Sequence, residues 1–431
     1  MSRILLAGLS FLAACSTSQP PAADTVATPA ATRADGTPAG ASRLLVQNGA
    51  DLLAEQLPPV LAGRRIGLVT NHTGLDATRR STIDLLADRT DVELVALYGP
   101  EHGIRGTAAP GEKVDSGRDA RTGLPVHSLY GSTRKPTPAM LEGVEALVFD
   151  IQDVGARQYT YIYTMALAME AAAAQRIPFV VLDRPNPVTG DIVEGGLLDT
   201  AYASFVGMYA IPSRHGMTVG ELARLFNDRF GIGAELHVVS MRGWRRDLWH
   251  DETGHEWVAP SPNLPRLESA VHYPGTVFFE GTNLSEGRGS SHPFEQTGAP
   301  WLRAEEVVAE MNRLALPGVR FEAVTFTPVA SAAKFGGVPL RGVRLVATDR
   351  DAYRPLEATL RLIDTIRRLH PGEFRFTGPT AESPNAYWLD RLAGTDRLRK
   401  AMESGTLDAL LAAWDAEARS FGDVRKGYLL Y

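Results

Sequence analysis

The chain has 431 residues, of which 44% are hydrophobic and 22% charged, so it is long enough for two domains with sizeable cores. Its formal net charge of −6 offers no broad basic surface, so we expect no nucleic-acid partner. Because the chain holds a single cysteine, a disulfide within it is excluded.

Residues 1–15 resemble the signal peptide of a bacterial lipoprotein. Arg3 precedes an apolar run at 4–14 that is too short to span a bilayer, and the run leads into LAAC at 12–15. That tetrapeptide is similar to a lipobox, which implies cleavage before Cys15 and lipid attachment to its thiol. The alternative is an ordinary signal peptide that contains a cysteine. We expect a lipoprotein, because the single thiol of this exported chain lies at the position where a lipid would be attached.

Residues 16–42 are rich in Ala, Pro, Thr and Ser and have almost no large apolar side chain. Such a segment buries too little surface to offset its ordering entropy, so it is expected to be a disordered tether. Ser16 after the cysteine resembles the outer-membrane sorting pattern of Gram-negative lipoproteins. The expected location is therefore periplasmic, with a lipid anchor in the outer membrane.

The part from residue 43 to 258 alternates apolar runs with helical patterns. Helical patterns lie at 79–88, 137–142, 159–174 and 218–230, and apolar runs lie at 66–71, 92–99, 144–153, 178–185 and 235–241. Apolar strands separated by helices predict a parallel sheet that is covered on both faces. We therefore expect an α/β domain with a doubly wound, Rossmann-like sheet, because five strands are too few for an eight-stranded barrel.

From residue 259 to 431 the pattern changes to that of a smaller α+β domain. Residues 259–300 are rich in Gly, Pro, Ser and Asn and predict a long loop, which in a compact protein is usually functional. Helices are then expected at 304–315, 356–369 and 406–421, and strands at 319–329 and 342–348.

Polar residues follow each of the first four apolar runs at the point where the run ends. The endings are NHTG at 71–74, GPEHGIRG at 99–106, DIQDVGARQYTY at 150–161 and DRPNPVTG at 183–190. Since ligands bind at the carboxyl ends of parallel strands, a cleft is expected at this edge. Asn71 could instead cap a helix, and Asp150 and Asp183 could be hydrogen-bonded strand ends. Glu101 beside His102 in a Gly-flanked turn has no such structural use.

The motifs of cofactor and metal sites are missing from the chain. It contains no G-x-G-x-x-G after the first strand, no G-x-x-x-x-G-K-[ST], no H-E-x-x-H and no G-x-S-x-G. Its ten histidines show no metal-ligand spacing, so neither a cofactor nor a metal is expected. Carboxylates remain as the reactive groups, and glycoside hydrolysis leads the reactions that need only paired carboxylates.

Six stretches of the chain resemble the exo-β-N-acetylmuramidases of the NamZ type. They are GPEHGIRG (99–106), FDIQDVGARQYTYIYTM (149–165), LDRPNP (182–187), IPSRHGMTVGEL (211–222), PSPNLP (260–265) and the stretch that runs from YPGTVFFEG to EQTGAP (273–300). The resemblance implies a Rossmann-like domain, a smaller second domain and a cleft between them. It also implies release of N-acetylmuramic acid from the non-reducing ends of peptidoglycan fragments.

Within this resemblance, Glu101 is the expected general acid. Glu286 is the first choice for the second carboxylate, with Asp153 and Asp150 close behind. A separation of about 5 Å between the two carboxyl groups would indicate a retaining reaction, and about 6.5–9.5 Å an inverting one.

The expected substrate contacts are drawn from the same stretches. The lactyl carboxylate of muramic acid suits a guanidinium, and the candidates are Arg105, Arg157, Arg184, Arg214 and Arg288. Tyr159 could stack on a sugar. Further candidates are Asn71, His102, Asp150, Gln152, Asp183, Asn186, His215, Asn263, Glu280 and Asn283. The expected partners are MurNAc–GlcNAc and muropeptides. A non-catalytic sugar-binding lipoprotein and a carboxylate enzyme for another acidic sugar stay open as alternatives.

Overall fold

The computed structural model describes residues 46–101, 103–105, 116–379 and 387–431. One compact unit extends over Leu44–Tyr431. The expected signal peptide with Cys15, the expected tether and His102 lie outside the described residues. The expected domain boundary between residues 258 and 259 stays a prediction.

The first group of elements is built on a seven-stranded sheet with the order β3-β4-β2-β1-β5-β6-β7. Every neighbouring pair is parallel except β3 and β4. Numbered along the chain, the parallel strands follow the order 3-2-1-4-5-6 of a doubly wound dinucleotide-type sheet, which confirms the predicted fold class. The strands are β1 (Arg65–Thr70), β2 (Glu93–Gly99), β3 (Gly117–Arg118), β4 (Pro125–Ser128), β5 (Ala146–Asp150), β6 (Phe179–Leu182) and β7 (Leu236–Val239).

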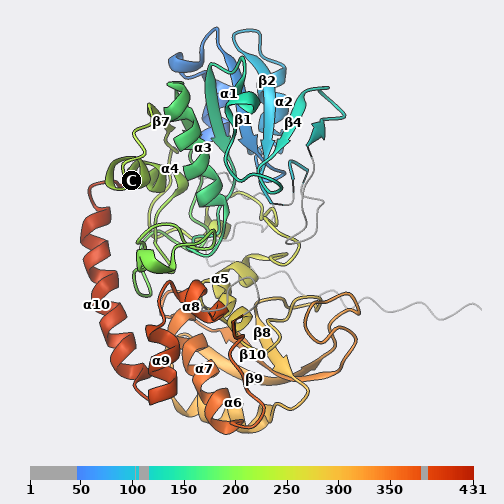
Figure 1. Ribbon diagram of the computed structural model, residues 1–431, viewed down its shortest axis with the longest axis vertical. Coiled ribbons are helices and arrows are strands. Elements are labelled where there is room, and N and C mark those ends of the chain that lie inside the picture. The colour runs from blue at the N-terminus through green and yellow to red at the C-terminus, as the bar shows by residue number, and fades with distance from the viewer. Residues whose placement is uncertain (1–45, 102, 106–115, 380–386) are drawn as a thin grey trace, which may run out of the picture. The chain divides into compact units, whose positions relative to one another are not determined.

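Helices cover both faces of this sheet (Figure 1). Ile66 and Leu68 of β1 pack in one apolar cluster with side chains of α1 (Gly49–Glu55) and α2 (Thr82–Ala87). Val69 belongs to the cluster on the other face, with side chains of α3 (Tyr161–Gln175) and α4 (Val219–Arg229). Since both faces are buried, the strands are apolar throughout, which is why the sequence shows runs without alternation.

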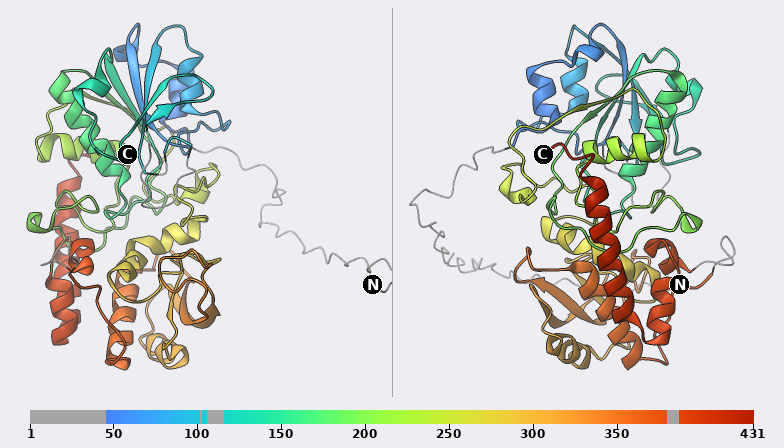
Figure 2. Two further views of the ribbon diagram at one scale, coloured as in Figure 1. Left: turned by 45° about the vertical axis from the view of Figure 1, so that its right-hand side comes forward. Right: turned by 90° about the vertical axis from the view of Figure 1, so that its left-hand side faces the viewer.

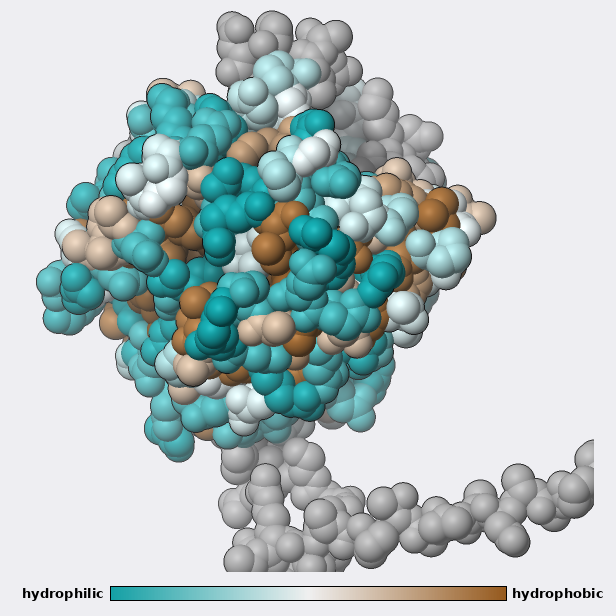
Figure 3. All heavy atoms as spheres, turned by 90° about the horizontal axis from the view of Figure 1, so that it is seen from below, coloured by the Kyte–Doolittle hydropathy of each residue, from teal (hydrophilic) through white to brown (hydrophobic). Residues whose placement is uncertain are grey.

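The second group of elements surrounds a three-stranded antiparallel sheet with the order β8-β10-β9. Its strands are β8 (Gln296–Ala299), β9 (Val319–Phe326) and β10 (Leu340–Ala347), and its helices are α6 (Ala304–Arg313), α7 (Pro355–Leu369), α8 (Trp388–Ala393) and α9 (Arg397–Ser404). This arrangement confirms a smaller α+β part. Figure 3 shows the end that carries α6, where hydrophilic side chains predominate and hydrophobic ones are scattered between them.

The prediction of one long loop at 259–300 was wrong. The segment contains α5 (Leu267–Thr276), the 3₁₀ helix η5 (Val277–Gly281) and β8. Pro274 and Gly275 look like a turn in the sequence, yet they lie inside α5. A Cβ on Gly275 would come within 2.0 Å of the Pro355 carbonyl oxygen, so this glycine lets α5 pack directly against α7.

The last helix, α10 (Leu407–Arg425), runs from the second group of elements back to the first, and the C-terminus lies next to α4 (Figures 1 and 2). The Arg224 guanidinium of α4 donates to the carbonyls of Tyr428 and Leu429. The remaining 3₁₀ helices are η1 (Pro59–Leu61), η2 (Pro138–Leu141), η3 (Thr200–Tyr202) and η4 (His250–Glu252). Across the described residues, we find no helix with the length and apolarity needed to cross a membrane.

Candidate active site

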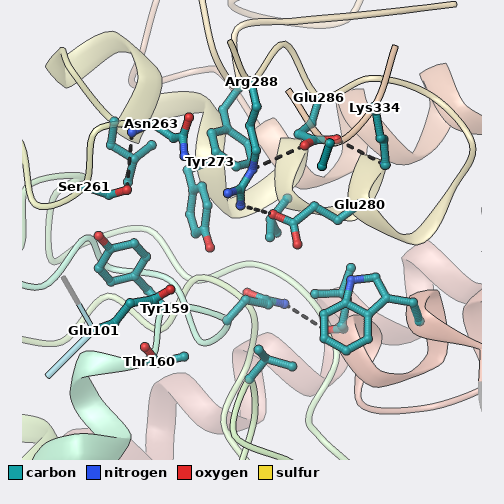
Figure 4. Close-up of a pocket in the computed structure, with 18 of the residues that line it drawn as sticks. Glu101, Tyr159, Thr160, Ser261, Asn263, Tyr273, Glu280, Glu286, Arg288 and Lys334 are labelled. Carbon is teal, nitrogen blue, oxygen red and sulfur yellow. Dashed lines mark hydrogen bonds and ion pairs between the residues drawn. The ribbon is translucent and has the colours of Figure 1, made fainter. Parts of the chain in front are cut away.

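A cavity of about 430 Å³ lies beyond the carboxyl ends of the parallel strands, and both groups of elements line it (Figure 4). Three carboxylates face it: Glu101 comes from the turn after β2, and Glu280 and Glu286 come from η5 and the segment after it. The other residues that line the cavity and enter the argument below are Tyr130, Gln158, Tyr159, Asn263, Tyr273, Phe294, Arg288, Lys334 and Trp388.

Glu101 occupies a tight turn at the end of β2. The amide of Gly103 donates to the Pro100 carbonyl at 3.0 Å, and Gly103 adopts a φ of +71° that favours glycine. Tyr130, from the segment after β4, stands next to the Glu101 side chain. Burial and then this carboxylate raise the pKa of Tyr130 to about 12, so the phenol stays protonated and able to donate to Glu101.

The facing wall carries a cluster of four charged side chains, Glu280, Glu286, Arg288 and Lys334 (Figure 4). Arg288 Nη2 lies 2.5 Å from Glu280 Oε1, and Arg288 Nε lies 3.2 Å from Glu286 Oε1. Lys334 Nζ lies 3.1 Å from Glu286 Oε2. Burial works to lower the pKa of Arg288, but the two carboxylates outweigh it and hold that pKa above its ordinary value.

Lys334 ties this wall to the backbone. Its ammonium donates to the carbonyls of Phe279, Thr282 and Leu284 at 3.1, 3.0 and 2.8 Å. These carbonyls end η5 and begin the segment that leads to Glu286, so Lys334 fixes the backbone between two of the carboxylates. An ammonium has three protons, and three carbonyls already accept them.

Aromatic rings form another part of the wall. The ring of Tyr273 packs edge-on against Tyr159 at 5.6 Å and against Phe294 at 4.9 Å. The Tyr159 hydroxyl is buried and has no hydrogen-bond partner among the described residues. Such a hydroxyl costs free energy unless a ligand or water satisfies it, which fits a position at a binding surface.

Six of the residues predicted from the sequence line the cavity. They are Glu101, Tyr159, Asn263, Glu280, Glu286 and Arg288. The structure therefore brings together the turn after β2, the start of α3 and the segment that follows α5, although these lie far apart along the chain.

The four other predicted arginines do not line the cavity. Arg157 is fully buried and donates to the carbonyls of Gly196, Ile211, Leu392 and Ala393. Arg184 is buried in an ion pair with Asp150, and Arg214 in one with Glu194. Arg105 pairs with Asp119. Arg157, Arg184 and Arg214 are buried and use their donors inside the fold, whereas the Arg105 side chain is 44% exposed.

The predicted strand-end carboxylates are also occupied inside the protein. Asp150 accepts from Arg184 and from the hydroxyl of Thr82. Asp183 accepts from the hydroxyls of Thr218 and Tyr431 and from the Gly220 amide. This is the structural alternative that the sequence left open for both residues.

Asp153 and His215 form a buried pair, and neither residue lines the cavity. Asp153 Oδ2 accepts from the Gly155 amide at 2.8 Å and lies 3.7 Å from His215 Nε2. The other carboxylate oxygen, Oδ1, is buried without a partner among the described residues. Asp153 does not line the cavity, so the case for it as the second carboxylate is weaker than that for Glu286.

The remaining predicted amides make structural hydrogen bonds away from the cavity. Asn71 accepts from Thr73, and Gln152 donates to the carbonyls of Asp153 and Pro185. Asn186 donates to the Met217 carbonyl, and Asn283 donates to the Glu373 carbonyl.

Sequence reasoning missed several residues that line the cavity, above all Tyr130, Gln158, Tyr273, Lys334 and Trp388. One of them carries a usable signal, because Lys334 is the single charged residue between positions 327 and 340. Within the described part of the chain, no group of three or more His, Cys, Asp and Glu side chains could hold a metal ion.

Two family models match the chain. The model described as exo-beta-N-acetylmuramidase NamZ, N-terminal, matches residues 66–268, and its C-terminal counterpart matches residues 271–431. A curated relative, peptidoglycan beta-N-acetylmuramidase NamZ of Bacillus subtilis (strain 168), is 48% identical over 387 residues, which are 90% of this chain and 91% of the relative.

Solved structures agree with this result. Two crystal structures of DUF1343 family proteins from Bacteroides fragilis NCTC 9343 each cover 90% of this chain, with TM-scores of 0.83 and 0.72. Their sequences are 37% and 32% identical to this one, and the alignments cover 100% and 99% of those chains. The chain thus belongs to the exo-β-N-acetylmuramidase NamZ family.

Proposed function

We propose that the protein is an exo-acting glycoside hydrolase that releases N-acetylmuramic acid from the non-reducing ends of peptidoglycan fragments. Membership of the NamZ family and the 48% identical muramidase relative support this proposal. The structural observation that carries it is the cavity with Glu101 on one wall and Glu280 and Glu286 on the facing wall. Paired carboxylates on either side of a sugar are what glycoside hydrolysis requires.

Glu101 acts as the general acid in this reaction. It protonates the glycosidic oxygen as the bond to the anomeric carbon breaks, and Tyr130 orients its carboxyl group. Glu286 acts from the other wall, as the base that activates water or as the nucleophile at the anomeric carbon. The aromatic edge of Tyr159 and Tyr273 provides an apolar surface for the sugar ring.

The test is release of free N-acetylmuramic acid by the full-length protein. The substrates are a MurNAc–GlcNAc disaccharide and a chromogenic N-acetylmuramide. We expect turnover of both, and we expect Glu101→Gln to lower kcat by about 10²–10⁴-fold, the usual contribution of a general acid. Glu93→Gln, an exposed glutamate at the other end of the same strand, is the matched control and should keep wild-type activity.

Two results would contradict the proposal. Tight binding of the disaccharide without any release would indicate a sugar-binding protein. Full activity of the folded Glu101→Gln variant would remove Glu101 from the role of acid.

We also propose that the enzyme works in the periplasm, where a lipid anchor holds it in the outer membrane. The lipobox-like LAAC at 12–15 and the tether composition at 16–42 support this location. Cys15→Ala should move the protein from the membrane fraction to the soluble fraction and should abolish palmitate labelling. Unchanged membrane association of that variant would contradict the anchor.

A further inference from the structure

The proposed function raises the question of which group recognises muramic acid. This sugar differs from N-acetylglucosamine by a lactyl ether that ends in a carboxylate, so a selective site needs a cation with unused donors. We propose that Arg288 binds the lactyl carboxylate of the substrate. The inference rests on the proposed function, and it assigns a specificity role to one side chain in the cavity.

The cations that line the cavity among the described residues are Arg288 and Lys334. Lys334 has no free donor for a ligand, because three carbonyls accept the protons of its ammonium and Glu286 lies 3.1 Å away. Two arginines near the strand ends also use their donors inside the protein. Arg157 donates to four carbonyls, and Arg184 is buried in an ion pair with Asp150. Elimination leaves Arg288.

The guanidinium of Arg288 is held in place and still has donors to offer. Nη2 donates to Glu280, Nε lies 3.2 Å from Glu286 Oε1 without forming a hydrogen bond, and the group lies 5.0 Å from the centre of the Phe294 ring. Nη1 has no hydrogen-bond or ion-pair partner among the described residues, and the Arg288 side chain is 32% exposed. A guanidinium that one hydrogen bond and a second carboxylate already hold loses little entropy when its remaining N–H groups bind a carboxylate.

The charge of the cluster allows an anion to approach. Glu280 and Glu286 carry two negative charges, and Arg288 and Lys334 carry two positive ones, so the four side chains together are neutral. Glu101 lies across the cavity from Arg288 in Figure 4. A sugar between the two walls can therefore place its glycosidic oxygen toward Glu101 and its lactyl group toward Arg288.

The experiment compares two substrates that differ only in the charge of the lactyl group. They are the chromogenic N-acetylmuramide and its lactyl N-methylamide, which keeps the size and loses the charge. We expect the full-length wild type to prefer the acid by roughly 10- to 100-fold in kcat/KM, the range for a hydrogen bond to a charged group. Arg288→Met should lose most of that preference.

Arg361→Met is the matched control. Arg361 also lies between two carboxylates, with Nε 2.8 Å from Glu357 and Nη1 2.7 Å from Asp408, but it does not line the cavity. This variant should keep the wild-type preference. Arg288→Gln serves as a second variant if Arg288→Met fails to fold, because its amide can still donate to Glu280.

A folded Arg288 variant that still prefers the acid as strongly as the wild type would overturn the inference. Titration calorimetry with N-acetylmuramic acid and its lactyl N-methylamide measures the same preference without turnover. If the wild type hydrolyses neither substrate, the proposed function fails. The binding preference of wild type against variant then still decides whether Arg288 recognises the carboxylate.

Discussion

Glu286 has surroundings that distinguish it from the other carboxylates at the cavity. It is 5% exposed, and Arg288 and Lys334 each approach one of its oxygens, whereas among the described residues Glu280 has an ion pair with Arg288 only. Two adjacent cations suit a group that acts as base or nucleophile. We expect Glu286→Gln to lower kcat by about 10²–10⁴-fold and Glu280→Gln to lower it less. Steady-state kinetics decides, and a larger loss in Glu280→Gln would make Glu280 the second carboxylate.

Asp183 makes the stability depend on pH. Burial raises its pKa from the ordinary value of 3.8 to about 6, although hydrogen bonds from Tyr431, Gly220 and Thr218 oppose the rise. The folded protein therefore keeps this proton at pH values where the unfolded chain has lost it. The stabilisation is complete below pH 3.8 and is lost as the pH rises through about 6.

The corresponding prediction concerns Asp183→Asn, whose amide can donate to both hydroxyls. Between pH 4 and pH 7, the wild type should lose about 1–3 kcal/mol more of its unfolding free energy than this variant does. Urea titrations at both pH values measure the difference. Asp228→Asn removes an exposed carboxylate and should behave like the wild type. Equal pH dependence in wild type and Asp183→Asn would contradict the assignment.

At the scale of elements, the contact between α5 and α7 positions the wall that carries Glu280. Gly275 has the Pro355 carbonyl oxygen only 2.0 Å from where its Cβ would be, so Gly275→Ala must push the helices apart. We expect this change to lower the unfolding free energy by about 1–3 kcal/mol and to reduce kcat. Gly422→Ala in α10 meets nothing within 4 Å and should stabilise by about 0.5–1 kcal/mol. Thermal unfolding of both variants tests the contrast, and equal melting temperatures would contradict it.

The helices and strands also show which patterns in the sequence were sufficient to predict an element. The apolar runs predicted β1, β2, β5, β6 and β7, because a strand buried on both faces needs such a run. The strands β3 and β4 were missed, since they lie at the edge, are short and are only partly apolar. The helix α5 was mistaken for a loop because Pro and Gly near its end are read locally as a turn, whereas the packing against α7 keeps them helical.

At the scale of the whole molecule, the two groups of elements share packing and the cavity. The largest apolar cluster joins Val154, Val188 and Trp249 from the first group to many side chains of the second. Arg157 adds hydrogen bonds from the first group to the end of α8. Since both groups line the cavity, activity should disappear in the same urea range in which tryptophan fluorescence reports unfolding.

The variant Arg157→Met tests whether the urea midpoint of activity and the urea midpoint of fluorescence shift together. It leaves four buried carbonyls without their donor, at a cost of about 3 kcal/mol or more, so both midpoints should fall together. Loss of activity at a clearly lower urea concentration than the fluorescence change would show that the cavity opens before the fold does.

The sequence by itself determined the doubly wound sheet, the smaller α+β part and the family resemblance, and it predicted Glu101 at a site after β2, where Glu101 lines the cavity. These features follow from local patterns, because the apolar runs and the polar residues that end them are adjacent in the chain. Only the tertiary structure decided that Arg288, and not the other arginines, faces the cavity beside Glu280 and Glu286. It also added Tyr130 and Lys334. Which side of a segment faces a ligand depends on packing against residues far away in the sequence, and no local pattern records that choice.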